Sequence, residues 1–411
     1  MKIQQVRALE ILDSRGTPTV QAQVRLANGT CATAQAPSGA STGQHEAVEL
    51  RDGDPRRHAG KGVLQAVRNI ELELGPSVLG LNAEDQAEVD ARLIEIDGSP
   101  SKGRLGANAI LAVSCAVARA AAMALKVPLW RHLAGSRKAT LPVPMVNIVS
   151  GGLHAGRNLE FQDFLVRPHG YADLASALEA VVAVHRATGR LLAEQGCVLT
   201  GVADEGGWGP RLQSNEQAIQ VLHEAIRQSG TSMDIVLDVA SSHFFEAGTY
   251  RMEGRGLTAA GMCDMLESWV TKYGVRSIED PLAEDDWDGW RLMTSRVGKQ
   301  VRLVGDDLFV TNLARVEKGI QEGAANAVLV KMNQIGTLTE TFGVIDRARE
   351  AGFGAVISAR SGETEDSFLA DLAVASGAGE IKIGSITRSE RLAKYNRLLE
   401  IEKWELPTSG D

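Results

Sequence analysis

Six segments in the second half of the chain share one design, an apolar run that ends on a charged or polar residue. Successive ends are 41, 27, 25, 29 and 22 residues apart, and every step but the first suits one strand, one crossover helix and two loops. Regular βα units predict a parallel sheet, and enough of them close into a barrel. The six ends are Asp238, Glu279, Asp306, Lys331, Arg360 with Ser361, and Lys382.

A barrel of this kind brings the ends of its strands together at one mouth, where catalytic residues normally lie. Three carboxylates, two lysines and an arginine would then share a small volume. A single acidic residue at a strand end is more often a helix cap or a surface charge, but three in register favour a ligand set. Because neighbouring carboxylates repel one another, the pattern predicts a divalent cation between them.

Composition restricts the function further. The chain has 411 residues, 44% of them hydrophobic and 23% charged, which is typical of a globular protein with room for two domains. Its formal net charge of −9, without a basic cluster, argues against a nucleic-acid partner. Four cysteines without CxxC spacing suit a reducing compartment. We see neither a signal peptide nor a membrane span, and we expect a cytoplasmic enzyme.

The first third of the chain has a different organisation. Residues 3–36 alternate as strands, and helical patterns follow at about 62–74, 83–95 and 107–125. We therefore expect a small α+β domain over residues 1–135 and a second domain over 136–411, which opens with a hairpin of residues 144–150 and 161–168. A long helix over residues 173–195 and a helix capped by Ser214 complete the expectation.

Long motifs recur in order along almost the whole chain. They are SRGTPTV at 14–20, SGASTGQHEAVELRDGD at 38–54, ADEGGWGP at 203–210 and LDVASS at 237–242, then SIEDP, GDDLFVTN, VKMNQIGTL, RSGETEDSF and RSERLAKYN. With these motifs the chain resembles the enolase family. The resemblance implies an α/β fold with a small N-terminal α+β domain and an enolase-type (β/α)8 barrel, assembled as a homodimer or a higher homo-oligomer. It also implies two Mg²⁺ ions and a small anionic phosphorylated substrate, 2-phosphoglycerate, which is dehydrated to phosphoenolpyruvate.

The resemblance also implies a role for each matching residue. Asp238, Glu279 and Asp306 match the carboxylates of the first Mg²⁺ site, and Ser41 matches a ligand of the second ion and a substrate contact. Lys331 matches the base and Glu205 the acid for the departing hydroxyl, with Asp163 and His154 as further catalytic residues. The substrate-binding matches are Arg360, Ser361, Lys382 and Gln162.

These residue types suit the chemistry. A proton beside a carboxylate is very weakly acidic, so Mg²⁺ on the carboxylate oxygens would absorb the charge that develops when this proton leaves. Lys331 must be neutral to accept the proton, and we expect Lys382 and Mg²⁺ to disfavour its charged form. Glu205 must be protonated to help hydroxide leave, which we expect from a site that is poor in water and crowded with acids.

Several departures from the family motifs fall at the site itself. Ala359 stands where the motif SHRSGE has a histidine, and Asp163 stands where QEF has a glutamate. Further changes are Ser150 and Leu153 in the NGGSHAG motif, Ile383 in IKTG and His243 in ASSEF. The metal ligands and Lys331 are retained while their surroundings change, which favours a retuned site.

Three interpretations remain open. The first is a specialised lyase acting on a phosphonylated relative of 2-phosphoglycerate, such as carboxyphosphonoenolpyruvate synthase of phosphinothricin-type pathways. The second is an ordinary glycolytic enolase that tolerates the changes. The third is a catalytically silent paralogue retained for binding. Metal dependence separates the third interpretation from the other two.

Overall fold

The computed structural model describes residues 1–39, 43 and 45–406, and its first part is a small sheet packed against helices. Strands β1, β2 and β3 form an antiparallel meander in that order, as the alternating sequence predicts. Strands β2 and β3 pack against α4, a helix that is buried along most of its length, while β1 packs against α1 and α2. The elements are β1 (Ile3–Leu12), β2 (Pro18–Leu26), β3 (Cys31–Gln35), α1 (Leu64–Asn69), a π-helical turn (Ile70–Leu74), α2 (Gly75–Val78), α3 (Gln86–Asp97), α4 (Ala107–Leu125) and α5 (Leu129–Ala134).

Helix α4 corrects the expectation that no segment of the chain is long and apolar enough for a membrane span. By length and composition it is the one helix in the described part of the chain that could cross a membrane, with a mean hydropathy of 1.7. Because 78% of its apolar window is buried by the surrounding protein, its composition is that of a core helix. Its apolar residues form the central contact between the small sheet and the other N-terminal helices.

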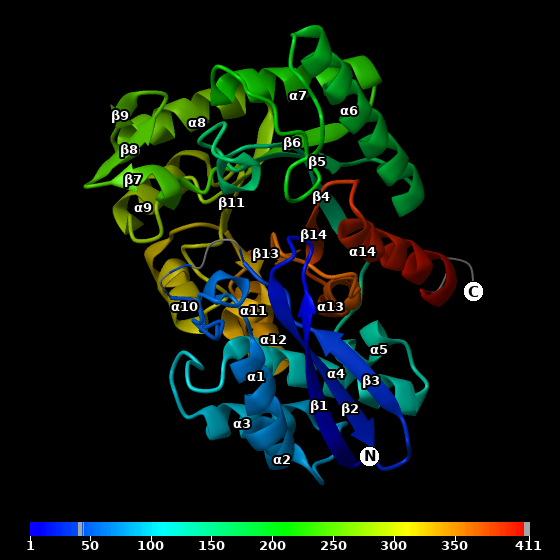
Figure 1. The fold of residues 1–411 in the computed structure, drawn as a ribbon. Helices are drawn as coiled ribbons and strands as arrows, with labels where there is room; N and C mark the ends of the chain where they lie inside the picture. Colours follow the sequence, from blue (N-terminus) through cyan, green and yellow to red (C-terminus); the bar gives the residue numbers. More distant parts are fainter. Residues whose placement is uncertain (40–42, 44, 407–411) are drawn as a thin grey trace.

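The second part of the chain closes into an eight-stranded barrel, which Figure 1 shows above the small sheet. Around the barrel the strands follow the order of the sequence, with β14 pairing back onto β4. The proposed division between residues 135 and 136 falls between α5 and β4. The strands are β4 (Val143–Ser150), β5 (Asp163–Pro168), β6 (Met233–Asp238), β10 (Val275–Glu279), β11 (Arg302–Gly305), β12 (Ala327–Val330), β13 (Gly354–Ser358) and β14 (Gly379–Gly384).

Helices between the strands cover the outside of the barrel. The predicted hairpin is present, because β4 and β5 pair antiparallel, and Ser214 caps α7 as predicted. Two helices, α6 and α7, separate β5 from β6, and one crossover helix precedes each later strand from β10 onward. They are α6 (Leu174–Glu194), α7 (Asn215–Ser229), α8 (Ala259–Tyr273), α9 (Trp287–Val297), α10 (Leu313–Glu322), α12 (Leu338–Glu350), α13 (Phe368–Ser376) and, after β14, α14 (Ser389–Glu400); α11 (Met332–Ile335) is one turn that follows β12.

Two features depart from a regular parallel barrel. Strand β5 runs antiparallel to β6 as well as to β4, so the sheet is mixed at this point. The long first step of 41 residues holds a three-stranded meander, β7 (Phe245–Glu246), β8 (Thr249–Met252) and β9 (Arg255–Leu257), inserted between β6 and α8. The α/β fold predicted from the sequence is otherwise confirmed.

Candidate active site

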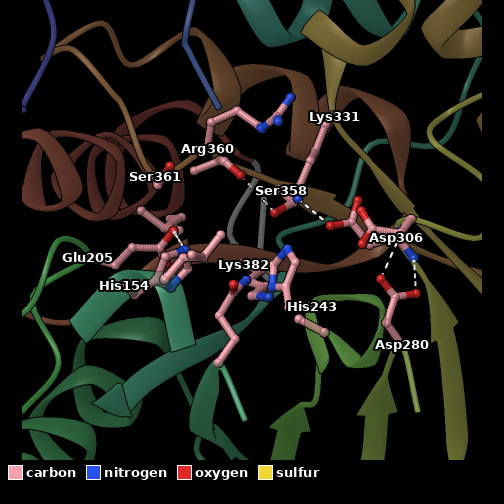
Figure 2. Close-up of a pocket in the computed structure, with 16 residues that line it drawn as sticks. His154, Glu205, His243, Asp280, Asp306, Lys331, Ser358, Arg360, Ser361 and Lys382 are labelled. Carbon is pink, nitrogen blue, oxygen red and sulfur yellow. Dashed lines mark hydrogen bonds and ion pairs between the residues drawn. The ribbon is translucent and has the colours of Figure 1, made fainter. Parts of the chain in front are cut away.

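The polar strand ends gather around one cavity at the mouth of the barrel, as Figure 2 shows. Side chains from opposite sides of the barrel line it together, including those of several residues that the sequence placed at the site. The lining residues are Leu153, His154, Gln162, Glu205, Ala240, His243, Asp280, Asp306, Asp307, Lys331, Ser358, Ala359, Arg360, Ser361, Lys382 and Ile383. Ser41 lies outside the described residues.

Two of the three predicted metal ligands share one lysine. Asp238 and Glu279 end neighbouring strands, β6 and β10, in register with each other. The Lys382 ammonium group, from β14 across the barrel, donates to both, at 2.7 Å to Asp238 Oδ2 and 2.6 Å to Glu279 Oε2. Gln162 Nε2 also donates to Asp238 Oδ2, at 3.3 Å. The buried ammonium group of Lys382 therefore lies between these two carboxylates.

The electrostatics of this group fit a divalent cation. Burial, followed by the charge of Asp238, raises the pKa of Glu279 well above its ordinary value. Burial opposes the charge on Lys382, but Asp238 and Glu279 raise its pKa well above the ordinary value. Ionised carboxylates closed off from water need positive charge beside them, and oxygen donors are those that hard cations prefer. Asp238, Glu279 and Asp306 therefore fit Mg²⁺ by their chemistry.

Lys331 follows β12 directly, and its ammonium group lies 2.5 Å from Asp306 Oδ2. Although burial disfavours the charged lysine, Asp306 raises its pKa, and Lys331 in turn lowers the pKa of Asp306 against the effect of burial. Lys331 is therefore charged in this arrangement of charges, and the expected neutral form would require a cation that compensates Asp306. The sequence argument weighed Lys382 and a metal ion but not the direct ion pair with Asp306.

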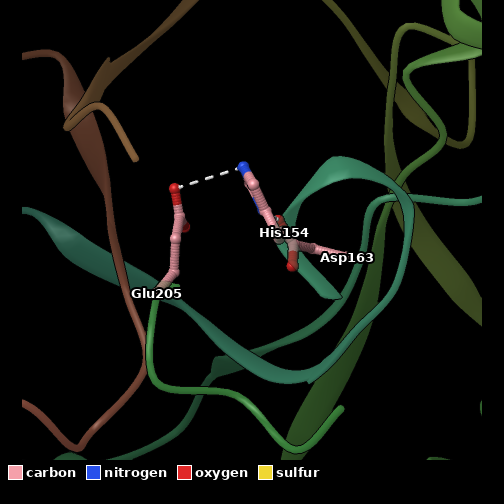
Figure 3. Close-up of side chains that lie close together, drawn as sticks. All are labelled: His154, Asp163 and Glu205. Carbon is pink, nitrogen blue, oxygen red and sulfur yellow. Dashed lines mark hydrogen bonds and ion pairs between the residues drawn. The ribbon is translucent and has the colours of Figure 1, made fainter. Parts of the chain in front are cut away.

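His154, Asp163 and Glu205 form a buried row, shown in Figure 3. His154 Nδ1 lies 2.8 Å from Asp163 Oδ2, and its Nε2 lies 3.7 Å from Glu205 Oε1. The other oxygen of Asp163 accepts a hydrogen bond from Asn147 Nδ2 at 2.5 Å. Burial works against a charged ring, yet the carboxylates of Asp163 and Glu205 raise the pKa of His154 to about 9.

The same row corrects the expected charge of Glu205. Burial favours the protonated acid, but His154, Arg391 and the two site lysines together lower its pKa below the ordinary value. Glu205 is therefore ionised beside a charged His154. Its position is set by a tight turn, in which Gly206 adopts a φ of +92° and a side chain at Gly207 would meet Ser150 Oγ at 2.8 Å.

Arg360 and Ser361 follow β13 and face the cavity from the side of the N-terminal sheet. Arg360 Nη1 donates to Glu46 Oε2 at 3.1 Å and to Asn333 Oδ1 at 3.0 Å. Arg15 Nη1 donates to Ser361 Oγ at 3.1 Å. The cationic side of the cavity is therefore built from both parts of the chain.

Several residues with clear roles at this site were missed by the sequence argument. Glu46 lies inside a quoted motif, yet only the fold brings its carboxylate to Arg360. Asp280 has a φ of +42° and accepts the backbone N–H groups of Asp306 and Asp307 at 2.9 and 2.8 Å. The ligand atoms of these three aspartates lie close enough together to hold a metal ion, as do those of His154, Asp163 and Glu205. Because both oxygens of Asp280 already bind backbone donors, we interpret Asp280 as a support for Asp306.

Arg391 was also missed, although it lies within a quoted motif. It is fully buried in α14 and donates from Nη1 to the carbonyl oxygens of Arg360 and Ile383, at 2.7 and 3.0 Å. Its Nη2 atom donates to the carbonyl oxygen of Ser361 at 2.6 Å. One guanidinium group therefore joins the end of β13 to the end of β14.

Comparisons with known proteins cover the chain almost end to end. The family model described as the enolase C-terminal TIM barrel domain matches residues 138–409, and that of the enolase N-terminal domain matches residues 3–133. The protein named Enolase 1 of Methylococcus capsulatus is 51% identical to this chain over 408 residues, covering 98% of this chain and 97% of that protein. Both parts of the chain, the N-terminal domain and the barrel, thus match the enolase family.

Proposed function

The chain belongs to the enolase family of hydro-lyases, and on this basis we propose that it dehydrates 2-phosphoglycerate to phosphoenolpyruvate. One observation carries the proposal. The side chains at the strand ends form two ion-paired groups, Lys382 with Asp238 and Glu279, and Lys331 with Asp306, whose charges act on each other, although their surroundings differ from the family motifs. The likeness to a protein named Enolase 1 also favours this substrate over a specialised one.

Asp238, Glu279 and Asp306 would hold the first Mg²⁺ ion, and Ser41 would contribute to a second. Bound there, Mg²⁺ would stabilise the negative charge that develops on the substrate carboxylate after the α-proton leaves. Lys382 already lies against two of these carboxylates, so it would remain close enough to contact the substrate carboxylate. Gln162, which donates to Asp238, would help to orient that ligand.

Lys331 would remove the α-proton. Its pKa is raised by Asp306, while burial and the charges of Arg360 and Lys382 act to lower it. Glu279 also raises this pKa, so a cation that compensates both Asp306 and Glu279 would leave burial, Arg360 and Lys382 to lower it. Lys331 would then become neutral and could accept a proton at Nζ.

Glu205 and His154 would deliver the proton to the departing hydroxide. His154 is charged below a pH of about 9 and lies 3.7 Å from Glu205. Because Glu205 is ionised, it would first take a proton from His154 Nε2 and then pass it to the departing hydroxide. Asp163 touches only the far side of this imidazole ring, so we propose that it positions His154. Arg360 and Ser361 would bind the phosphate.

Ultraviolet detection of phosphoenolpyruvate formed from 2-phosphoglycerate, with excess Mg²⁺, tests the proposal. We expect turnover that is abolished by Lys331→Ala and by chelation of the metal. Lys299→Ala, at an exposed lysine remote from the strand ends, is the matched control and should retain full activity. A folded wild-type protein that forms no phosphoenolpyruvate would contradict the proposal.

A second candidate substrate is a carboxyphosphonate-bearing relative of 2-phosphoglycerate, as in carboxyphosphonoenolpyruvate synthesis. The observation in its favour is Ala359, which lines the cavity with a methyl group in place of an imidazole. Ala359→His should raise 2-phosphoglycerate turnover if the cavity has been widened for a larger substrate. Asp163→Glu is less suitable as a second substitution beside Ala359→His. Asp163 is completely buried, and an added methylene would overpack its site.

A further inference from the structure

His243 lies at the cavity without an assigned role. It belongs to a short 3₁₀ turn, Ser241–Phe244, which follows β6 and the carboxylate of Asp238. Figure 2 shows its ring among the cavity residues, near Lys382. Ala359 lines the same cavity from β13. The cavity therefore has no imidazole at the end of β13 but has one at the end of β6.

The ring of His243 has no hydrogen-bonding partner in the described part of the chain. Among the described residues neither of its nitrogens makes a hydrogen bond, and Nδ1 is sealed from solvent. Nε2 likewise has no partner among these residues, but it is not sealed. Buried polar atoms in folded proteins are nearly always paired, so the sealed Nδ1 constrains where the ring carries its proton, while the ring lines a cavity that a ligand can enter.

The position of the ring proton follows from the same contacts. A sealed N–H group without an acceptor costs more than a sealed acceptor without a donor. The neutral ring therefore carries its proton on Nε2, the nitrogen that is not sealed. Burial lowers the pKa of His243, as do His154 and Arg157, although Asp238 opposes this effect. A neutral ring with Nε2–H can donate one hydrogen bond into the cavity.

His243 also separates two hollows. Together with Leu153 it lines both the main cavity and a side cavity that contains Arg157 and Glu160. A substrate group that points toward this side of the main cavity would lie beside His243 and Leu153. The size and the hydrogen-bonding character of this wall therefore depend on His243.

We propose that His243 is a specificity-determining residue, whose Nε2–H group donates a hydrogen bond to an anionic oxygen of the bound phosphoglycerate-type substrate. This inference rests on the proposed function, because the substrate class is taken from it. His243 supplies from β6 the imidazole contact that Ala359 cannot supply from β13.

Three variants test the contact. His243→Leu should raise KM for 2-phosphoglycerate by about tenfold or more, because a hydrogen bond to a charged group is lost. His243→Gln, whose amide can still donate, should recover most of that loss. His223→Leu, at an exposed histidine of α7, should leave KM unchanged. Melting temperatures within a few degrees of the wild-type value would show that the fold is intact. An unchanged KM in a folded His243→Leu enzyme would overturn the inference while leaving the proposed function in place.

Nuclear magnetic resonance of ¹⁵N-histidine-labelled enzyme provides a readout that does not depend on turnover. The resonances of His243 are those lost in His243→Gln. We expect a neutral ring protonated at Nε2, and a change in its shifts when 2-phosphoglycerate is added with Mg²⁺. A proton on Nδ1, or shifts that stay constant during the titration, would overturn the inference. Absence of turnover by the wild-type enzyme would instead count against the proposed function.

Discussion

The ammonium group of Lys331 lies 2.5 Å from a carboxylate oxygen of Asp306. The residue proposed as the base and a residue proposed as a metal ligand therefore neutralise each other. Each moves the pKa of the other toward the ionised form, against the effect of burial on both. Binding a cation at Asp306 and freeing Lys331 to act as a base are thus coupled through one ion pair.

Lys331→Met should destabilise the metal-free protein. Removing one partner of a buried ion pair leaves Asp306 uncompensated, at a cost of roughly 3 kcal/mol in the free energy of unfolding. Added Mg²⁺ should restore part of this loss, because it compensates the same carboxylate. Urea unfolding with chelator and with Mg²⁺ measures both effects, and Lys299→Met is the control. Equal stability of variant and wild type in chelator would contradict the pairing.

Glu279→Gln should leave the stability of the metal-free protein intact but remove the stabilisation by Mg²⁺ and substrate. Burial and Asp238 raise the pKa of Glu279, so its ionised form opposes folding, while Lys382 keeps Asp238 as a partner after the change. We expect the metal-free variant to be as stable as the wild type within about 1 kcal/mol, or more stable. The wild type should gain about 2.7 kcal/mol when its ligands are present at 100 times their dissociation constants. Thermal melting with Mg²⁺ and 2-phosphoglycerate should show no such gain in the variant.

His154 should make the metal-free protein less stable as pH rises. Its pKa is raised from 6.5 to about 9, so the folded protein holds a proton that the unfolded chain has lost. The stabilisation is complete below pH 6.5, declines between pH 6.5 and 9, and is absent above about pH 9. It amounts to about 3 kcal/mol at about 1.4 kcal/mol for each pH unit. Urea unfolding across this range should show the decline in the wild type, and a matching decline in His154→Gln would refute it.

Arg391→Lys should impair substrate binding without touching the substrate. The single nitrogen of lysine does not reproduce the fork of Nη1 and Nη2 that reaches the three carbonyl oxygens, so the backbone that carries Arg360 and Ser361 loses support. We expect about 2 kcal/mol of destabilisation and a clear rise in KM, with a smaller effect on kcat. Arg397→Lys is a matched control on the same helix, because Arg397 binds Asp371 and Glu405 instead. Equal KM values in the two variants would argue against a positioning role for Arg391.

Much of the fold could be predicted because its signals are local. Alternating residues predicted the strands of the N-terminal sheet, and helical spacing predicted α4 to the residue. Apolar runs ending in Asp238, Glu279 and Asp306 predicted parallel strands. The carboxyl ends of such strands lie at the same mouth of a barrel. The antiparallel pairing of β5 with β6 could not be predicted, because two helices separate these strands along the chain.

By itself the sequence determined the six charged or polar strand ends at the barrel mouth, because each of them follows a recognisable apolar run. Only the tertiary structure decided which partner each group takes. Lys382 binds Asp238 and Glu279, which lie 144 and 103 residues away, and Asp163 lies behind His154. Only the tertiary structure also left the ring of His243 at the cavity without a hydrogen bond to the residues that the structure describes. Hydrogen bonds depend on the distance and direction between side chains in space, and residue spacing along the chain carries no such information across strands.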